Sequence, residues 1–186
     1  MLDSPADDPL VGDVVIGAAE IQQRVEALGK EITEDYAGRT PLLVCVLKGA
    51  YVFLTDLARA IDLPVEIDFI AATSYGSSTR TSGVVRLVKD LDQDISGRDV
   101  ILVEDIVDSG LTLRYLKRNL MARSPKTLAV AALLARETAN VERLGVSYVG
   151  FSVPPDFLIG YGLDLDQRYR NLPFLARYDG PVDRDT

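Results

Sequence analysis

Short, largely apolar runs alternate along this chain with segments of helical periodicity, and this alternation strongly limits the folds available to it. The apolar runs cover residues 42–47, 65–72, 99–103, 127–134 and 146–151. Apolar residues three and four apart predict helices that precede or separate these runs, over 18–32, 51–61 and 111–120. Strands that are apolar on both sides are typical of a parallel sheet covered by helices. The sequence therefore predicts an α/β fold with a central, mostly parallel sheet flanked by helices.

The length and the two ends of the chain indicate a single domain. The chain has 186 residues, which suits one ordinary domain with its own core. Residues 1–10 and 179–186 are polar and contain Pro and Asp. We therefore expect a disordered N-terminus and a loose C-terminus, with one domain over residues 11–178.

Composition excludes several classes of chemistry. The chain has no histidine, so Ser-His-Asp and Cys-His catalysis are excluded and acid–base work falls to carboxylates, lysines or tyrosines. Its one cysteine, Cys45, lies inside an apolar run and is expected to be a buried core thiol. The net charge of −8 argues against an undirected electrostatic grip on nucleic acid.

No segment of the sequence resembles a membrane or secretion signal. No apolar stretch approaches the roughly 20 residues that a membrane span needs. The N-terminus is acidic and lacks the cationic and then apolar pattern of a signal peptide. We expect a cytoplasmic protein with no nucleic-acid or membrane partner.

The most informative polar segment directly follows the apolar run 99–103. It reads Glu104-Asp105-Ile106-Val107-Asp108-Ser109-Gly110-Leu111-Thr112. Ligands of such sheets bind beyond the carboxyl ends of the strands. Small residues at a helix start let backbone amides converge on a phosphate, and paired carboxylates can accept sugar hydroxyls or attract magnesium. The segment predicts a site that holds a sugar diol at one end and its phosphate at the other.

A plainer interpretation of the same segment is helix capping. Asp108 or Ser109 would then only cap the helix that follows. We consider this interpretation weaker for the whole segment, with its double acid, third acid and Ser-Gly-x-Thr, than for an isolated Asp-Ser-Gly.

Residues 100–112 resemble the phosphoribosyl pyrophosphate signature of the type I phosphoribosyltransferases. The form Glu-Asp-Ile-Val-Asp-Ser-Gly is similar to that of the hypoxanthine-guanine phosphoribosyltransferases, and the similarity extends over about residues 21–178. The resemblance implies the type I phosphoribosyltransferase fold, with a core over about 38–151 and a small C-terminal hood over about 152–178 that includes an N-terminal contribution. It implies transfer of the 5-phosphoribosyl group from phosphoribosyl pyrophosphate (PRPP) to hypoxanthine or guanine, giving IMP or GMP plus pyrophosphate in purine salvage.

The resemblance also implies roles for the acidic segment. Glu104 and Asp105 would contact the ribose hydroxyls and magnesium, and Asp108 would be the catalytic base at N7 of the purine. The 5′-phosphate would be bound by the run Asp108, Ser109, Gly110, Leu111 and Thr112.

Two further segments of the family surround the reaction. Lys48 and Gly49 resemble its pyrophosphate loop, in which the Leu47–Lys48 peptide is often cis, and Arg170 would also contact pyrophosphate. Ser74 and Tyr75 would open a mobile loop, over residues 74–83, that closes over the site and excludes water.

Residues 153–164 are similar to the base-recognition hood of the family. Phe157 would stack on the purine, Leu158 would offer backbone groups to its edge, and Asp164 would bind a second magnesium. Arg136 stands where the family usually has a lysine that donates to the purine 6-oxo group. An arginine still donates to a carbonyl, but its planar fork is larger, so hypoxanthine and guanine lead while xanthine or a non-purine base stays open.

The resemblance thus implies a magnesium-dependent purine transferase that works as a homo-oligomer, a dimer or tetramer. Two other functions compete with this one. One is a pyrimidine-operon regulator of the same superfamily, which binds RNA and needs a basic face. The other is a two-component receiver domain, which shares the sheet and the acidic strand ends but leaves residues 109–112 and the hood unexplained.

Overall fold

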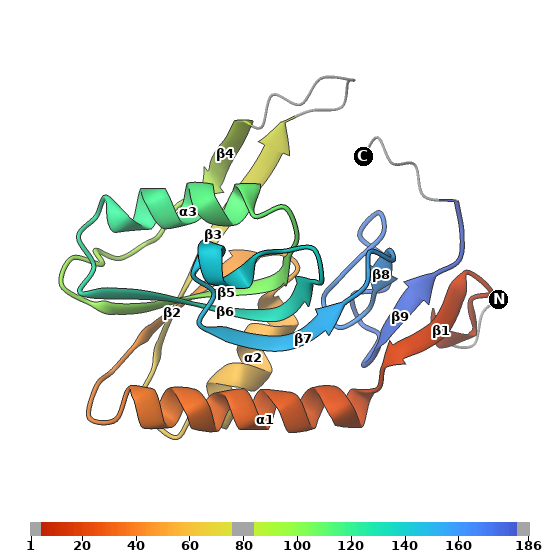
Figure 1. Ribbon diagram of the computed structural model, residues 1–186, viewed down its shortest axis with the longest axis horizontal. Coiled ribbons are helices and arrows are strands. Elements are labelled where there is room, and N and C mark those ends of the chain that lie inside the picture. The colour runs from red at the N-terminus through yellow and green to blue at the C-terminus, as the bar shows by residue number, and fades with distance from the viewer. Residues whose placement is uncertain (1–4, 76–83, 182–186) are drawn as a thin grey trace.

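The main sheet of the computed structural model, which describes residues 5–75 and 84–181, confirms the α/β fold. Its six strands lie in the order β4-β3-β2-β5-β6-β7 (Figure 1). The four pairings from β3 to β7 are parallel, whereas β4 is antiparallel to β3. The bounds are β2 Leu42–Leu47, β3 Glu66–Tyr75, β4 Val84–Lys89, β5 Asp99–Val107, β6 Thr127–Arg136 and β7 Tyr148–Val153.

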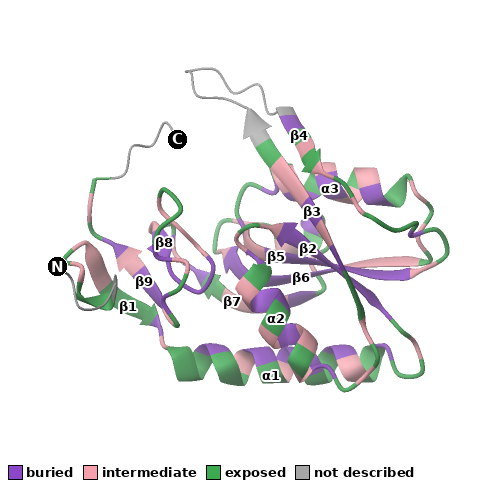
Figure 2. Ribbon diagram, turned by 180° about the vertical axis from the view of Figure 1, so that it is seen from behind, coloured by how far each residue is buried: buried purple, intermediate pink, exposed green. Residues whose placement is uncertain are grey.

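Helices cover both faces of this sheet because consecutive residues of the buried strands, which point to opposite faces, are apolar. Leu43 and Cys45 of β2 pack with α1 (Ala18–Asp35) and α2 (Tyr51–Ala60) on one face. Leu42, Val44 and Val46 pack with α3 (Leu111–Met121) on the other face, where the short α4 (Val141–Leu144) also lies. Figure 2 shows the resulting band of buried central strands.

Cys45 is a core thiol, as the sequence predicts. Its side chain is fully buried, and burial raises the pKa of Cys45 to about 12. The thiol therefore stays protonated and serves packing.

The hood is a second, three-stranded antiparallel sheet in the order β1-β9-β8. It combines β1 (Val11–Ile16) with β8 (Leu158–Ile159) and β9 (Leu175–Tyr178), so the N-terminal contribution lies beside the C-terminal strands (Figure 1). Within residues 1–10, for which the sequence predicts a loose segment, Pro5–Asp7 forms a 3₁₀ turn. Asp8 then accepts hydrogen bonds from the Leu10 amide at 3.0 Å and the Tyr169 hydroxyl at 2.7 Å.

Strands β3, β5 and β6 all continue past their apolar runs, and the extra residues of β3 and β5 include predicted site residues. β5 continues to Val107 because its polar end stays paired with β6, so Glu104 and Asp105 lie within the strand and not after it. β3 continues to Tyr75, and its last residues pair with the start of β4. Ser74 and Tyr75 therefore end a strand where a loop is predicted, and residues 76–83 lie outside the described residues.

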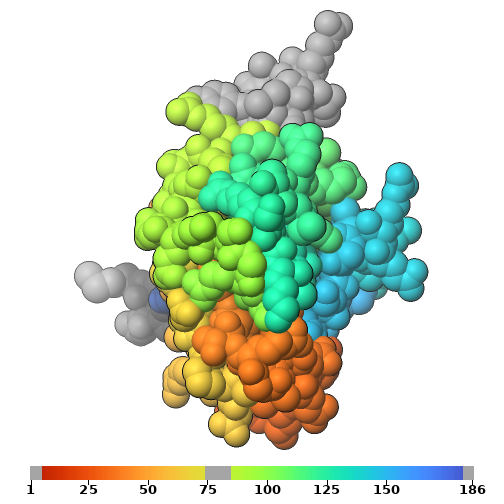
Figure 3. Space-filling model, turned by 90° about the vertical axis from the view of Figure 1, so that its left-hand side faces the viewer, coloured from red at the N-terminus to blue at the C-terminus, as the bar shows by residue number. Residues whose placement is uncertain are grey.

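The end of the sheet where the parallel strands begin is formed by the connections that precede them. These connections span residues 36–41, 61–65, 90–98 and 122–126. They lie together on the face in Figure 3, in orange, yellow, yellow-green and blue-green. None of the described helices combines the length and the apolarity that crossing a bilayer requires.

Candidate active site

One pocket opens at the carboxyl ends of β2 and β5 and collects most of the polar residues that the sequence singles out. Its volume is about 310 Å³. Such an edge is where ligands of parallel sheets bind. The lining residues are Val46, Leu47, Lys48, Gly49, Glu104, Asp105, Ile106, Val107, Asp108, Ser109, Gly110, Leu111, Thr112, Leu113, Asp164 and Arg170. We call this space the reaction pocket.

The phosphate end of the pocket is the start of α3, where the N-cap residue has no side chain to cap the helix. The N-cap is Gly110, whose φ of +73° is the left-handed conformation that glycine adopts readily. Ser109 Oγ accepts only a long hydrogen bond of 3.4 Å from the Leu111 amide. Neither Asp108 nor Ser109 is the N-cap residue, and Ser109 provides only this long bond, so the remaining amides of the first turn are available to bind an anion.

The acidic floor of the pocket combines a buried and a half-buried carboxylate, which are only partly paired. Glu104 is 5% exposed, and its carboxylate makes no hydrogen bond or ion pair with any described residue. Asp105 Oδ1 accepts a hydrogen bond from the Ile106 amide at 2.8 Å. Burial, followed by the neighbouring Asp105 charge, raises the pKa of Glu104, and burial also raises the pKa of Asp105. Adjacent carboxylates of this kind attract a cation or hydroxyl donors.

Lys48 and Gly49 close the other end of the pocket. The Leu47–Lys48 peptide is cis, as the resemblance implies. A Cβ on Gly49 would lie 1.5 Å from Asp105 Oδ2, so only glycine allows this approach. Lys48 Nζ donates to Gln167 Oε1 at 3.0 Å. The Lys48 ammonium group is therefore positioned by Gln167, a residue of the hood.

Arg170 and Asp164 face each other across the pocket wall. Arg170 Nη2 lies 2.7 Å from Asp164 Oδ1, and Arg170 Nη1 donates to the Gly162 carbonyl at 2.7 Å. Asp164 Oδ2 accepts from the Gln167 amide at 2.8 Å. Asp164, predicted as a second metal ligand, thus already has a partner on each oxygen.

The carboxylates of the reaction pocket fit a magnesium ion whose other ligands come mainly from the substrate. Within residues 5–75 and 84–181, no three His, Cys, Asp or Glu side chains converge as a metal cage. Mg²⁺ usually takes one or two carboxylates, together with substrate phosphates and water, so a full protein cage is not required. Glu104 has no partner among the described residues, and Asp105 lies next to it, so these carboxylates are suitable ligands.

Of the four residues predicted to bind the base, Asp164 lines the reaction pocket, whereas Arg136, Phe157 and Leu158 do not. Arg136 ends β6, and its Nη1 donates to the Pro154 carbonyl just before the hood. Phe157 is half-buried and meets the Tyr178 ring edge-on at 6.1 Å between centroids. Leu158 is buried in β8. The side chains of Ser74 and Tyr75 lie outside the described set.

Sequence reasoning missed several residues around the pocket. Gln167 contacts Lys48, and Gly162 packs on Gly49, since a Cβ there would lie 2.1 Å from the Gly49 carbonyl oxygen. Between Gly160 and Gly162 lies Tyr161, which bonds to Asp56. The available signal was the Gly-Tyr-Gly run, because closely spaced glycines indicate backbone in unusual conformations.

The Glu104→Gln variant is expected to be more stable than the unchanged protein at pH 7, by about 1 kcal/mol. Burial raises the pKa of Glu104 above its usual 4.5, so the folded state binds its proton more tightly than the unfolded chain does. The stability of the unchanged protein therefore falls as pH rises above that value, and the gap to the variant grows. Thermal unfolding at pH 5 and pH 8 measures this gap. The exposed Glu137→Gln is the control, and an equal shift for both variants contradicts the expectation.

Comparisons with known sequences and structures support the same interpretation. The chain matches the family model of the phosphoribosyl transferase domain over residues 17–167. It is 51% identical over 178 residues to the hypoxanthine-guanine phosphoribosyltransferase of Mycobacterium avium, with 92% of this chain and 88% of that protein covered. It is 45% identical over 167 residues to the hypoxanthine phosphoribosyltransferase of Salmonella typhimurium, covering 89% and 94%.

Solved structures are similar over nearly the whole chain. A hypoxanthine phosphoribosyltransferase from Staphylococcus aureus superposes with a TM-score of 0.87 at 34% identity, covering 96% of both chains. A hypoxanthine-guanine phosphoribosyltransferase from Bacillus anthracis gives 0.83 at 44% identity, covering 90% of this chain and 98% of the other. A receiver domain is therefore excluded. Fold, pocket and sequence agree that the chain belongs to the phosphoribosyltransferase family, among the hypoxanthine-guanine phosphoribosyltransferases.

Proposed function

We propose that this protein transfers the 5-phosphoribosyl group of PRPP to hypoxanthine or guanine, releasing pyrophosphate and forming IMP or GMP. One observation carries the proposal: two adjacent carboxylates, Glu104 buried and Asp105 half-buried, and a helix start with a glycine N-cap occupy the same pocket. The first suits a sugar diol and the second suits its 5′-phosphate. A single segment, residues 104–112, supplies both.

The reaction breaks the bond between C1 of the ribose and the pyrophosphate oxygen and forms a bond from C1 to N9 of the purine. Pyrophosphate leaves with the bonding electrons, so negative charge grows on its oxygens. Lys48 and Arg170, at the pocket end opposite α3, are the residues that stabilise this charge. Asp108 accepts the proton from N7 as N9 attacks. Its side chain is exposed in the loop before α3, where a base can reach it.

Magnesium bound with PRPP would be held by Glu104 and Asp105, with Asp164 as the second site implied by the resemblance. When bound, the ion neutralises charge on the leaving pyrophosphate. Asp164 forms an ion pair with Arg170. It can therefore bind magnesium only if Arg170 turns away from it to the pyrophosphate.

Arg136 is the residue that we assign to the purine 6-oxo group, with Phe157 stacking on the ring and Leu158 presenting backbone at its edge. All nitrogens of a guanidinium are donors, so the group matches a 6-oxo acceptor and opposes the 6-amino donor of adenine. Its bond to the Pro154 carbonyl links it to the segment that leads to Phe157.

A spectrophotometric assay across hypoxanthine, guanine, xanthine, adenine and uracil tests this function. We expect hypoxanthine and guanine to be the best substrates, with kcat/KM for adenine at least about 10² lower. A preference for adenine would contradict the role of Arg136. A preference for uracil would favour the pyrimidine-type alternative, against which the net charge of −8 also argues.

We further propose that the enzyme works in the cytoplasm as a homo-oligomer, a dimer or tetramer. This proposal is supported by resemblance to the family alone.

A further inference from the structure

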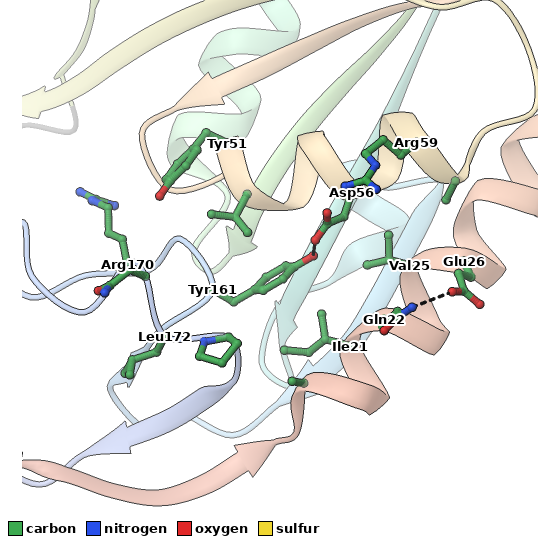
Figure 4. Close-up of a pocket in the computed structure, with 15 residues that line it drawn as sticks. Ile21, Gln22, Val25, Glu26, Tyr51, Asp56, Arg59, Tyr161, Arg170 and Leu172 are labelled. Carbon is green, nitrogen blue, oxygen red and sulfur yellow. Dashed lines mark hydrogen bonds between the residues drawn. The ribbon is translucent and has the colours of Figure 1, made fainter. Parts of the chain in front are cut away.

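We infer that Tyr161 is a positioning residue that ties the Arg170 segment of the hood to α2 and thereby sets the affinity for PRPP. The inference deepens the proposed transfer reaction and rests on it. Neither Tyr161 nor its partner Asp56 lines the reaction pocket. Both instead line a separate cavity of about 720 Å³ between α1, α2 and the hood (Figure 4).

The contact between the hood and α2 is a short, largely buried hydrogen bond. Tyr161 Oη donates to Asp56 Oδ2 at 2.7 Å, as the dashed line in Figure 4 marks. Tyr161 is 7% exposed, and Asp56 is half-buried. Burial raises the pKa of Tyr161, so its hydroxyl keeps the proton that it donates. Hydrogen bonds to a charged acceptor are among the stronger ones in proteins.

The backbone at Tyr161 holds a conformation that its surroundings must maintain. Its φ is +45°, between Gly160 and Gly162 at +100° each. Left-handed conformations are costly for a residue with a side chain and persist where neighbouring contacts fix them. The Tyr161 amide donates to the Leu172 carbonyl at 2.8 Å, and the hydroxyl bond to Asp56 fixes the other end of the residue.

Two contacts carry the position of Tyr161 into the reaction pocket. The next residue, Gly162, donates its amide to the Arg170 carbonyl at 2.9 Å and accepts from Arg170 Nη1 at 2.7 Å. Gly162 also packs directly on the Gly49 carbonyl, and Gly49 packs on Asp105. A shift of Tyr161 would therefore move Arg170 and loosen the Lys48-Gly49 loop together, both at the pyrophosphate end.

The Tyr161→Phe variant tests the inference because it removes one hydroxyl and keeps the ring. The expected result is a KM for PRPP raised about tenfold, with kcat and the KM for hypoxanthine within about twofold of the unchanged enzyme. Tyr148→Phe is the matched control: Tyr148 Oη donates to Asp35 Oδ2, also at 2.7 Å, but joins β7 to α1. If both variants change the KM for PRPP equally, the positioning role is refuted.

Changes at the acceptor separate positioning from stability. Asp56→Asn retains an oxygen acceptor and is expected to keep the KM for PRPP near that of the unchanged enzyme, whereas Asp56→Ala should raise it like Tyr161→Phe. The double variant that combines Tyr161→Phe with Asp56→Ala should be no worse than either single change. Effects that multiply would overturn the inference. If the protein without substitutions has no transferase activity, the proposed reaction itself is refuted. If it is active and Tyr161→Phe leaves the KM for PRPP unchanged, only the positioning role is refuted.

Discussion

The Asp108→Asn variant is expected to turn over about 10² to 10⁴ times more slowly than the unchanged enzyme. The amide has nearly the same shape as the carboxylate but cannot accept the N7 proton. Asp108 is exposed and has no hydrogen-bond or ion-pair partner among the described residues, so the change should leave the stability of the fold nearly unaltered. The rate at saturating PRPP and hypoxanthine measures the effect.

A matched control separates the base from general effects of losing an aspartate. Asp62→Asn changes an exposed aspartate just after α2, away from the reaction pocket, and should leave kcat as it is. Turnover of Asp108→Asn near that of the control would remove Asp108 from the role of base. A loss confined to the KM for PRPP would instead assign Asp108 to binding.

The Gly49→Ala variant is expected to lose about 10² or more in kcat/KM for PRPP. The added Cβ would lie 1.5 Å from Asp105 Oδ2 and 2.5 Å from its Cγ, so either the loop or the carboxylate must move. Movement of the loop would also disturb Gly162, which packs on the Gly49 carbonyl. Steady-state kinetics with PRPP as the varied substrate measures the loss.

Gly17→Ala is the corresponding control, because a Cβ at Gly17 meets nothing within 4 Å. It should match the unchanged enzyme in both kinetics and thermal midpoint. If Gly49→Ala behaves like this control, the close approach of the loop to Asp105 has no part in binding PRPP.

The sequence predicted the central sheet well because each of its buried strands is a short apolar run. The run Leu42–Leu47 coincides with β2, and the helical periodicity of 18–32 lies within α1. The sequence underestimated the length of β5 because Glu104 and Asp105 are polar. Pairing with β6 nevertheless keeps that end of the strand extended. The composition of a segment does not reveal which other strand will pair with it and so extend it.

The hood was predicted from resemblance, and its sheet could not be read from pattern. β8 has two residues and β9 has four, too few to show a period, and their partner β1 is distant in sequence. The same limit applied to the long-range contacts around the reaction pocket. The chemistry-bearing turn at 104–112 was local and could be predicted, whereas the contacts of Lys48 with Gln167 and Tyr161 with Asp56 join residues far apart in the chain.

The most direct test is a crystal structure of the protein with IMP and magnesium. We predict that the 5′-phosphate lies against the amides of residues 109–112 and that the ribose hydroxyls meet Glu104 and Asp105. A nucleotide bound elsewhere, with both carboxylates untouched by the ribose or by metal, would contradict this account of the site.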